Sequence, residues 1–192
     1  MNKAGLRKIY TAKRDALSLS QTAEGSRLIA LRFIESDIWK GCTVIHVFSS
    51  IPNKKEVDTT FIIHYFQANH PEIKLCTSII ADNGIDLIHS YIYNETTYKQ
   101  NKWGIPEPVE RVLLIETEID LVLLPLLAFD VKANRVGYGK GFYDRFLRNC
   151  KTSVIKVGLS LFEPTEDLID TDAWDVPMDW GVTPIEVLQC NL

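Results

Sequence analysis

The sequence lacks the features that mark several large classes of protein. Its four cysteines are far apart and form no C-x-x-C pair, which argues against zinc ribbons and thioredoxin-like redox motifs. No apolar run approaches the ~20 residues that span a bilayer. The charged residues 1–15 contain no apolar core of a secretory signal. We therefore expect a cytoplasmic protein with reduced thiols and no membrane partner.

Positive charge is also in short supply. Lys and Arg number 21 against 25 Asp and Glu, a net charge of −4. Such a chain has no overall positive field, so we expect no nucleic-acid partner, although a local basic pocket remains possible. The 192 residues suit one domain, and no repeat, linker or low-complexity tract divides them. We predict a single domain over 1–192, acting as a monomer on small molecules.

Two common catalytic signatures are missing as well. There is no G-x-S-x-G nucleophile elbow and no H-E-x-x-H metal motif, and the four histidines have no metal-ligand spacing.

Strand-like and helix-like segments alternate along the chain. Helical spacing covers 2–18, a stretch from an N-cap at Ser20 to about Asp37, 58–68 and 140–150. Strands are predicted at 43–48, 74–80, 85–93, 119–125 and 154–159, with a turn at 82–84 and a short element at 182–187. The alternation favours an α/β sandwich around a mostly parallel sheet.

The glycine-rich segment 134–145 follows the most apolar strand and leads into a helix. Its alternate glycines allow close backbone approach to an anion, and Arg135, Lys140 and a helix N-terminus add positive charge. The segment fits neither a P-loop, because Gly141 follows Lys140, nor a dinucleotide fingerprint, because Phe142 occupies its third glycine position. The residues alone favour a phosphate site over a tight turn with a solvated lysine.

Other candidate residues are scattered along the sequence. Asp144 and Asp175 could serve a magnesium ion or be surface carboxylates. Lys3, Arg7 and Arg14 fall on or near one helix face, a pattern more typical of a solvated stripe. Glu56 lies in a strand-end loop, and Trp103 beside two prolines could be a plate for a flat heterocycle or a plug under a loop.

Several of these motifs occur together, in the same order and spacing, in one family. Lys3-x-x-x-Arg7, Glu56-Val-Asp-Thr59, Trp103-Gly-Ile-Pro-Glu-Pro108, Leu121–Pro125, the 135–145 loop and Asp175-Val-Pro resemble 5-formyltetrahydrofolate cyclo-ligases over essentially the whole chain. Leu126 where many members have glycine and Phe142 in place of a common tyrosine are small departures. The resemblance implies a Rossmann-like three-layer α/β/α sandwich.

The resemblance also implies roles for individual residues. It places ATP, as co-substrate, on Lys3, Arg7, Arg135, Val136, Gly137, Tyr138, Gly139, Lys140, Gly141, Phe142 and Tyr143, and Mg²⁺ on Asp144 and Asp175. Folate would contact Ile51, Glu56, Trp103 and Tyr143. The implied catalytic residues are Lys140, Arg135 and Glu56, and the implied reaction is the ATP- and magnesium-dependent cyclisation of 5-formyltetrahydrofolate to 5,10-methenyltetrahydrofolate in one-carbon metabolism.

Two other functions stay open at this point. One is a folate- or nucleotide-binding regulator without turnover, and the other is an α/β phosphate enzyme, such as a sugar-phosphate isomerase, that consumes no ATP.

Overall fold

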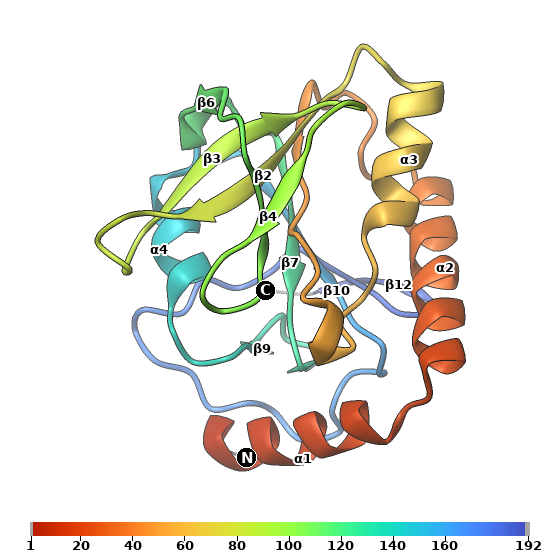
Figure 1. Ribbon diagram of the computed structural model, residues 1–192. Helices are drawn as coiled ribbons and strands as arrows, with labels where there is room; N and C mark the ends of the chain where they lie inside the picture. The colour runs from red at the N-terminus through yellow and green to blue at the C-terminus, as the bar shows by residue number, and fades with distance from the viewer. Residues whose placement is uncertain (1, 191–192) are drawn as a thin grey trace.

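A central sheet of eight strands organises the chain, which the computed structural model describes over residues 2–190 (Figure 1). The strand order is β12-β11-β10-β7-β1-β2-β3-β6. Five neighbouring strands, β11, β10, β7, β1 and β2, run parallel, and β12, β3 and β6 are antiparallel additions at the edges. The bounds are β1 Val44–His46, β2 Lys74–Ile80, β3 Leu87–Ile92, β6 Leu113–Leu114, β7 Leu121–Pro125, β10 Ile155–Leu159, β11 Trp180–Val182 and β12 Val187–Gln189.

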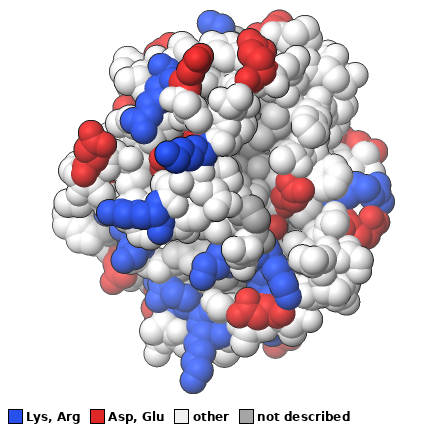
Figure 2. Space-filling model, in the orientation of Figure 1, with Lys and Arg blue, Asp and Glu red and all other residues white. Residues whose placement is uncertain are grey.

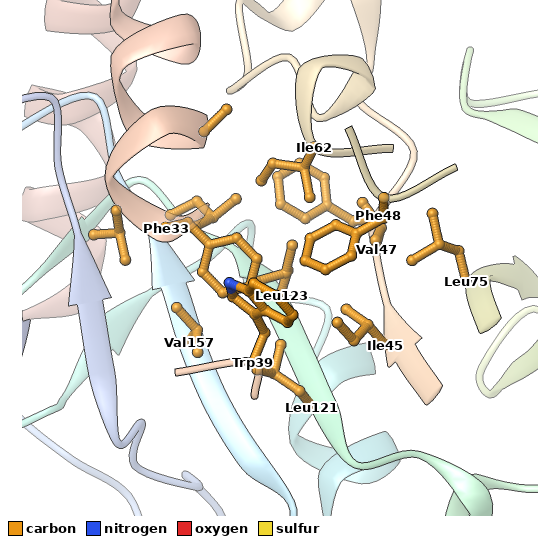
Figure 3. Close-up of a cluster of buried hydrophobic side chains, with 14 of the residues drawn as sticks. Phe33, Trp39, Ile45, Val47, Phe48, Ile62, Leu75, Leu121, Leu123 and Val157 are labelled. Carbon is orange, nitrogen blue, oxygen red and sulfur yellow. The ribbon is translucent and has the colours of Figure 1, made fainter. Parts of the chain in front are cut away.

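Helices cover both faces of this sheet. Both faces of β7 are apolar, and each is buried beneath a helical layer. Leu121 and Leu123 pack beneath α2 (Leu19–Glu35) and α3 (Thr60–Asn69), in the cluster that Figure 3 shows around Phe33. Val122 and Leu124 point the other way, toward the cluster that contains residues of α4 (Phe142–Asn149), and η2 (Glu116–Glu118) lies on that side too. Continuous apolar sequence is what a strand buried on both faces requires. The predicted three-layer α/β/α sandwich is confirmed.

Helix α1 (Lys3–Ala16) belongs to neither layer. It crosses below the sheet at the end where β7 finishes (Figure 1). Leu6 and Tyr10 bury their side chains there against a third apolar cluster, which also contains Leu127, Ala128, Val136 and Ile169. The helix thus closes off the carboxyl ends of the parallel strands, where open α/β sheets bind ligands.

Two small ladders lie outside the main sheet. β4 (Tyr98–Gln100) pairs with β5 (Pro106–Pro108), and β8 (Ala128–Phe129) pairs with β9 (Arg135–Val136). A short 3-10 helix, η1 (Pro52–Lys54), follows β1. None of these is predicted from the sequence, because two or three residues are too few to show a period.

Three boundary predictions need correction. The N-cap of α2 is Ser18 rather than Ser20: the Ser18 hydroxyl accepts the Gln21 N–H at 3.1 Å, and Gln21 Oε1 accepts the Ser18 N–H at 2.8 Å. The α4 helix begins at Phe142, since Gly141 is left-handed. The predicted element at 182–187 is wrong, because Thr183 N–H donates to Glu186 O at 3.0 Å in a turn between β11 and β12.

Within residues 2–190, no helix combines the length and the apolar content that crossing a bilayer requires.

Candidate active site

A cavity of about 1480 Å³ opens between α1 and the carboxyl ends of the parallel strands. Most of its lining comes from α1, the loop after β1, β2, the 103–107 loop, the glycine loop with the start of α4, and the 168–177 loop. Figure 2 shows a hollow in this face of the molecule with Lys and Arg side chains gathered below it. The local charge is therefore opposite in sign to the net charge.

The glycine loop, residues 137–141, forms one wall. Gly139 and Gly141 have φ of +86° and +66°, a conformation that side chains other than glycine adopt at a cost. Arg7 holds the loop from below, with its Nε donating to Gly137 O at 2.9 Å. A Cβ atom on Gly139 would lie 3.1 Å from the Arg7 guanidinium. The close approach of α1 to the loop thus depends on the glycine.

Three cations converge on this wall from two distant parts of the sequence. Lys3 and Arg7 project from α1, and Lys140 lies within the loop itself. Lys140 is exposed and has no carboxylate partner in the part of the chain that the structure describes. Lys3 is paired with Asp175 and lies 3.6 Å from Asp172. The arrangement offers an anion one uncommitted ammonium group and two more groups held in place by protein.

Two carboxylates flank the buried Arg135. Asp144 Oδ1 accepts Arg135 Nη2 at 2.7 Å and Val176 N at 3.2 Å. Asp175 Oδ2 accepts Asp172 N at 2.6 Å and pairs with Lys3. Burial works against ionisation of Asp175, but the Asp172 N–H and Lys3 outweigh it and lower its pKa. Asp175 is therefore held as an anion at the edge of the cavity, and Asp144 is ion-paired with Arg135.

Glu56 also lines this cavity and is only 7% exposed. Its Oε2 accepts the Ile51 N–H at 2.6 Å, and its Oε1 accepts the Tyr138 hydroxyl at 2.6 Å. Burial raises the pKa of Tyr138, with Glu56 adding to the effect, so the phenol keeps the proton that it donates. Burial also raises the pKa of Glu56, which places a carboxylate of unusual basicity in the wall.

Aromatic side chains complete the cavity. Trp103 is 44% exposed at the rim, and its loop is shaped by Asn101, whose Oδ1 accepts the Trp103 N–H at 2.9 Å. Glu107 accepts the Ile80 N–H at 2.9 Å and the Asn101 amide at 2.8 Å, which ties this loop to β2. Tyr143 lines the inner wall, hydrogen-bonded to Ser78. A flat ligand could enter between these aromatic surfaces.

The cavity brings together almost every residue singled out in the sequence. Those that line it are Lys3, Arg7, Ile51, Glu56, Trp103, Arg135, Gly137, Tyr138, Gly139, Lys140, Gly141, Phe142, Tyr143, Asp144 and Asp175. Val136 is the exception among the residues that the resemblance assigns to ATP, folate or Mg²⁺: it is fully buried in β9 and packs against α1. Its side chain therefore does not reach the cavity.

Two buried residues shape the site although the resemblance assigns them to neither ATP, folate nor Mg²⁺. Asp130 is fully buried, and its two oxygens accept from Lys132 N, Asn134 N, the Asn134 amide and Ile169 N at 2.7–3.0 Å. It thereby folds the turn before the glycine loop. Arg14 is only 5% exposed, contrary to the solvated stripe that its spacing suggests. Its partner, Tyr138, is more than a hundred residues away in the sequence.

Known proteins resemble this chain in sequence and in structure. Residues 1–184 match the model of the 5-formyltetrahydrofolate cyclo-ligase family. A probable 5-formyltetrahydrofolate cyclo-ligase of Schizosaccharomyces pombe is 30% identical over 180 residues, which cover 84% of each chain.

Two solved structures share the fold over nearly their full length. The 5,10-methenyltetrahydrofolate synthetase of Aquifex aeolicus has a TM-score of 0.79 and 27% identity, covering 99% of this chain and 93% of that one. The synthetase of Mycoplasma pneumoniae has a TM-score of 0.74 and 25% identity, covering 96% and 99%. The chain therefore belongs to the 5-formyltetrahydrofolate cyclo-ligase family.

Proposed function

We propose that this single domain uses ATP and Mg²⁺ to cyclise 5-formyltetrahydrofolate to 5,10-methenyltetrahydrofolate, with release of ADP and phosphate. The observation that carries the proposal is the convergence in one cavity of a cationic glycine loop and a buried carboxylate with aromatic walls. The loop suits a chain of phosphates, and the carboxylate and aromatic surfaces suit a flat heterocycle with N–H donors. The cavity is large enough for both ligands together.

The chemistry begins at the formyl group on N5, whose oxygen is a poor leaving group. That oxygen attacks the γ-phosphorus of ATP, the bond to the β-phosphate oxygen breaks, and ADP leaves. N10 then attacks the formyl carbon and loses its proton, the carbon–oxygen bond breaks, and phosphate departs as the methenyl bridge forms. Phosphoryl transfer of this kind depends on positioning and charge neutralisation more than on a protein nucleophile.

The residues divide this work between them. Lys140, Lys3 and Arg7 neutralise phosphate charge together with the loop N–H groups. Arg135, whose guanidinium is engaged by Asp144 and Val176 O, adds positive charge and orients Asp144. Glu56 accepts hydrogen bonds from the folate ring, and Trp103 covers its flat face.

The donor set at Asp144 and Asp175 fits Mg²⁺. One oxygen of each carboxylate, Oδ2 of Asp144 and Oδ1 of Asp175, has no protein donor within residues 2–190. Both side chains are about a quarter exposed. No group of three or more metal-binding side chains occurs in that range, but Mg²⁺ usually takes only one or two carboxylates and keeps several waters. Mg²⁺ would supply charge neutralisation on the phosphates.

The decisive assay mixes the purified protein with 5-formyltetrahydrofolate and Mg-ATP and records the methenyl chromophore together with ADP. Lys140→Ala should reduce kcat by about 10²–10³, the range for loss of one charge-stabilising donor. Lys99→Ala, which removes an exposed lysine outside the cavity, should leave it unchanged. Folate binding without chromophore or ADP would instead indicate a regulator, and isomerisation of a sugar phosphate without nucleotide would indicate the other class of enzyme.

A further inference from the structure

Arg14 lies in the second half of α1, on the inner side of the helix and behind the cavity. Its Nη2 donates to the Tyr138 hydroxyl oxygen at 2.5 Å, and its guanidinium carbon lies 5.4 Å from the centroid of the Tyr138 ring. Arg14 is not among the residues that line the large cavity; it borders a void of about 10 Å³ behind Glu56 and Phe48. A buried guanidinium in such a place needs an explanation, because an unpaired buried charge is costly.

The hydrogen bonds around Arg14 have a direction. Tyr138 has one hydroxyl proton, which it donates to Glu56 Oε1 at 2.6 Å, so its oxygen is the acceptor for Arg14. The other Glu56 oxygen accepts the Ile51 N–H at 2.6 Å. The Arg14 and Tyr138 bonds thus run from cation to hydroxyl to carboxylate, and both Glu56 oxygens act as acceptors, which suits an ionised carboxylate. Charge-assisted chains of this kind are stronger than isolated neutral bonds.

The hydrogen bonds from Arg14 through Tyr138 to Glu56 act against the effect of burial on the pKa of Glu56. Burial raises the pKa of Glu56, whereas the Tyr138 hydroxyl, the Ile51 N–H, Arg14 and Lys54 act to lower it. Tyr143, from α4, also interacts electrostatically with this carboxylate. Arg14 and Lys54 are therefore the two cations that offset the burial, and only Arg14 is linked to Glu56 through a hydrogen-bonded intermediary.

The same helix holds the glycine loop a second time. Arg7, two turns before Arg14, bonds the carbonyl of Gly137, and Arg14 bonds the side chain of the next residue, Tyr138. Helix α1 therefore fixes Tyr138 in two ways: Arg14 bonds its hydroxyl oxygen, and Arg7 bonds the carbonyl of the preceding residue, Gly137. Tyr138 joins the loop to Glu56 across the cavity wall.

We infer that Arg14 is a positioning residue for the reaction: through the Tyr138 hydroxyl it holds the Glu56 carboxylate and the glycine loop in register, and it touches neither substrate. The inference rests on the proposed function in that Glu56 is there assigned to folate. It predicts that folate binding depends on Arg14, a cation of α1, although α1 borders the part of the site proposed for ATP.

The first test compares Arg14→Met, which keeps an unbranched buried side chain without the charge, with Lys8→Met, which removes an exposed charge from the same helix. For R14M the acid limb of kcat/KM for 5-formyltetrahydrofolate should move up by about one pH unit. KM for the folate should rise more than KM for ATP. Arg14→Lys, which keeps a positive charge, should partly reverse both the shift of the acid limb and the rise in KM. Tyr138→Phe should reproduce the shift, and R14M/Y138F should add little to either single change.

The second test needs neither substrate nor turnover. Carbon-13 in the glutamate side-chain carboxyls, with the Glu56 signal assigned by Glu56→Gln, reports the Glu56 titration midpoint directly by NMR. That midpoint should be about one unit higher in R14M than in K8M. A protein that fails to cyclise the folate would refute the proposed function and leave this readout intact. An unchanged midpoint in folded R14M, or a fall in melting temperature with all kinetic constants affected alike, would overturn the inference about Arg14.

Discussion

Gly139 and Gly137 lie two residues apart in the same loop, yet a methyl group should destabilise the protein at Gly139 and have little effect at Gly137. Gly139 has φ +86°, and an added Cβ would lie 3.1 Å from Arg7 Nη2 and 3.2 Å from its Cζ. Gly137 has no positive φ, and an added Cβ meets nothing within 4 Å. The two Gly→Ala variants therefore form a matched pair of identical chemical change.

The expected cost at Gly139 has two parts. A non-glycine residue in the left-handed region loses about 1–2 kcal/mol. In addition, the Arg7 guanidinium must move by a few tenths of an ångström while its Nε is bonded to Gly137 O at 2.9 Å. For a chain of this size 1 kcal/mol corresponds to about 2–4 °C in Tm, so Gly139→Ala should lower Tm by roughly 2–8 °C. Gly137→Ala should stay within about 0.5 kcal/mol of the wild type.

Thermal unfolding followed by circular dichroism, without ligand, measures both values. The same two proteins should then be titrated with ATP. Gly139→Ala should raise KM for ATP because its loop and Arg7 are displaced, whereas Gly137→Ala should raise it only if its methyl group occupies space that the phosphates need. If Gly139→Ala is as stable as Gly137→Ala, the assignment of a strained loop backbone held against α1 is refuted.

Two further predictions concern the rim of the cavity and the base of the sheet. Trp103→Leu should raise KM for the folate about fivefold to tenfold, by loss of roughly 1 kcal/mol of ring contact, with kcat little changed; an unaltered KM would remove Trp103 from the folate site. Although partial burial opposes it, bonds from Lys151, Thr43 and Val44 lower the pKa of Asp120 to about 2, and the carboxylate joins β1 to β7. Because the folded pKa lies below the unfolded one, this stabilisation is present above about pH 4 and is lost as pH falls toward 2. Asp120→Asn should therefore lower the free energy of unfolding, measured in urea at neutral pH, by about 2 kcal/mol. If the difference between wild type and variant did not shrink in acid, this account would be contradicted.

The layers of the fold could be predicted because their signals are local. Residues 119–125 are almost continuously apolar, and that pattern alone places a strand between two helical layers. The β8–β9 ladder could not be predicted, because each strand has two residues and its pairing depends on the turn that Asp130 folds. The ladder directly precedes the glycine loop and therefore places the loop next to α1.

The candidate site divides in the same way. Glycine spacing and charge indicate an anion site at 134–145, but they do not show which glycine requires a positive φ. Arg14 shares a helix with Lys3 and Arg7, and periodicity assigns all three to solvent. Its burial depends on a hydroxyl at Tyr138 and a carboxylate at Glu56, both far away in the sequence, and no local pattern encodes that meeting.

The position of α1 also has a consequence for the order of folding. Leu6 and Tyr10 pack on Leu127, Val136 and Ile169, so this helix is synthesised more than a hundred residues before the surface that receives it. Contacts that close such long loops form late, after the shorter-range pairing of neighbouring strands. Until then Lys3, Arg7 and Arg14 are cations on an undocked helix. The sheet can thus assemble first, and the ligand site is completed in the last step, when the N-terminal helix docks.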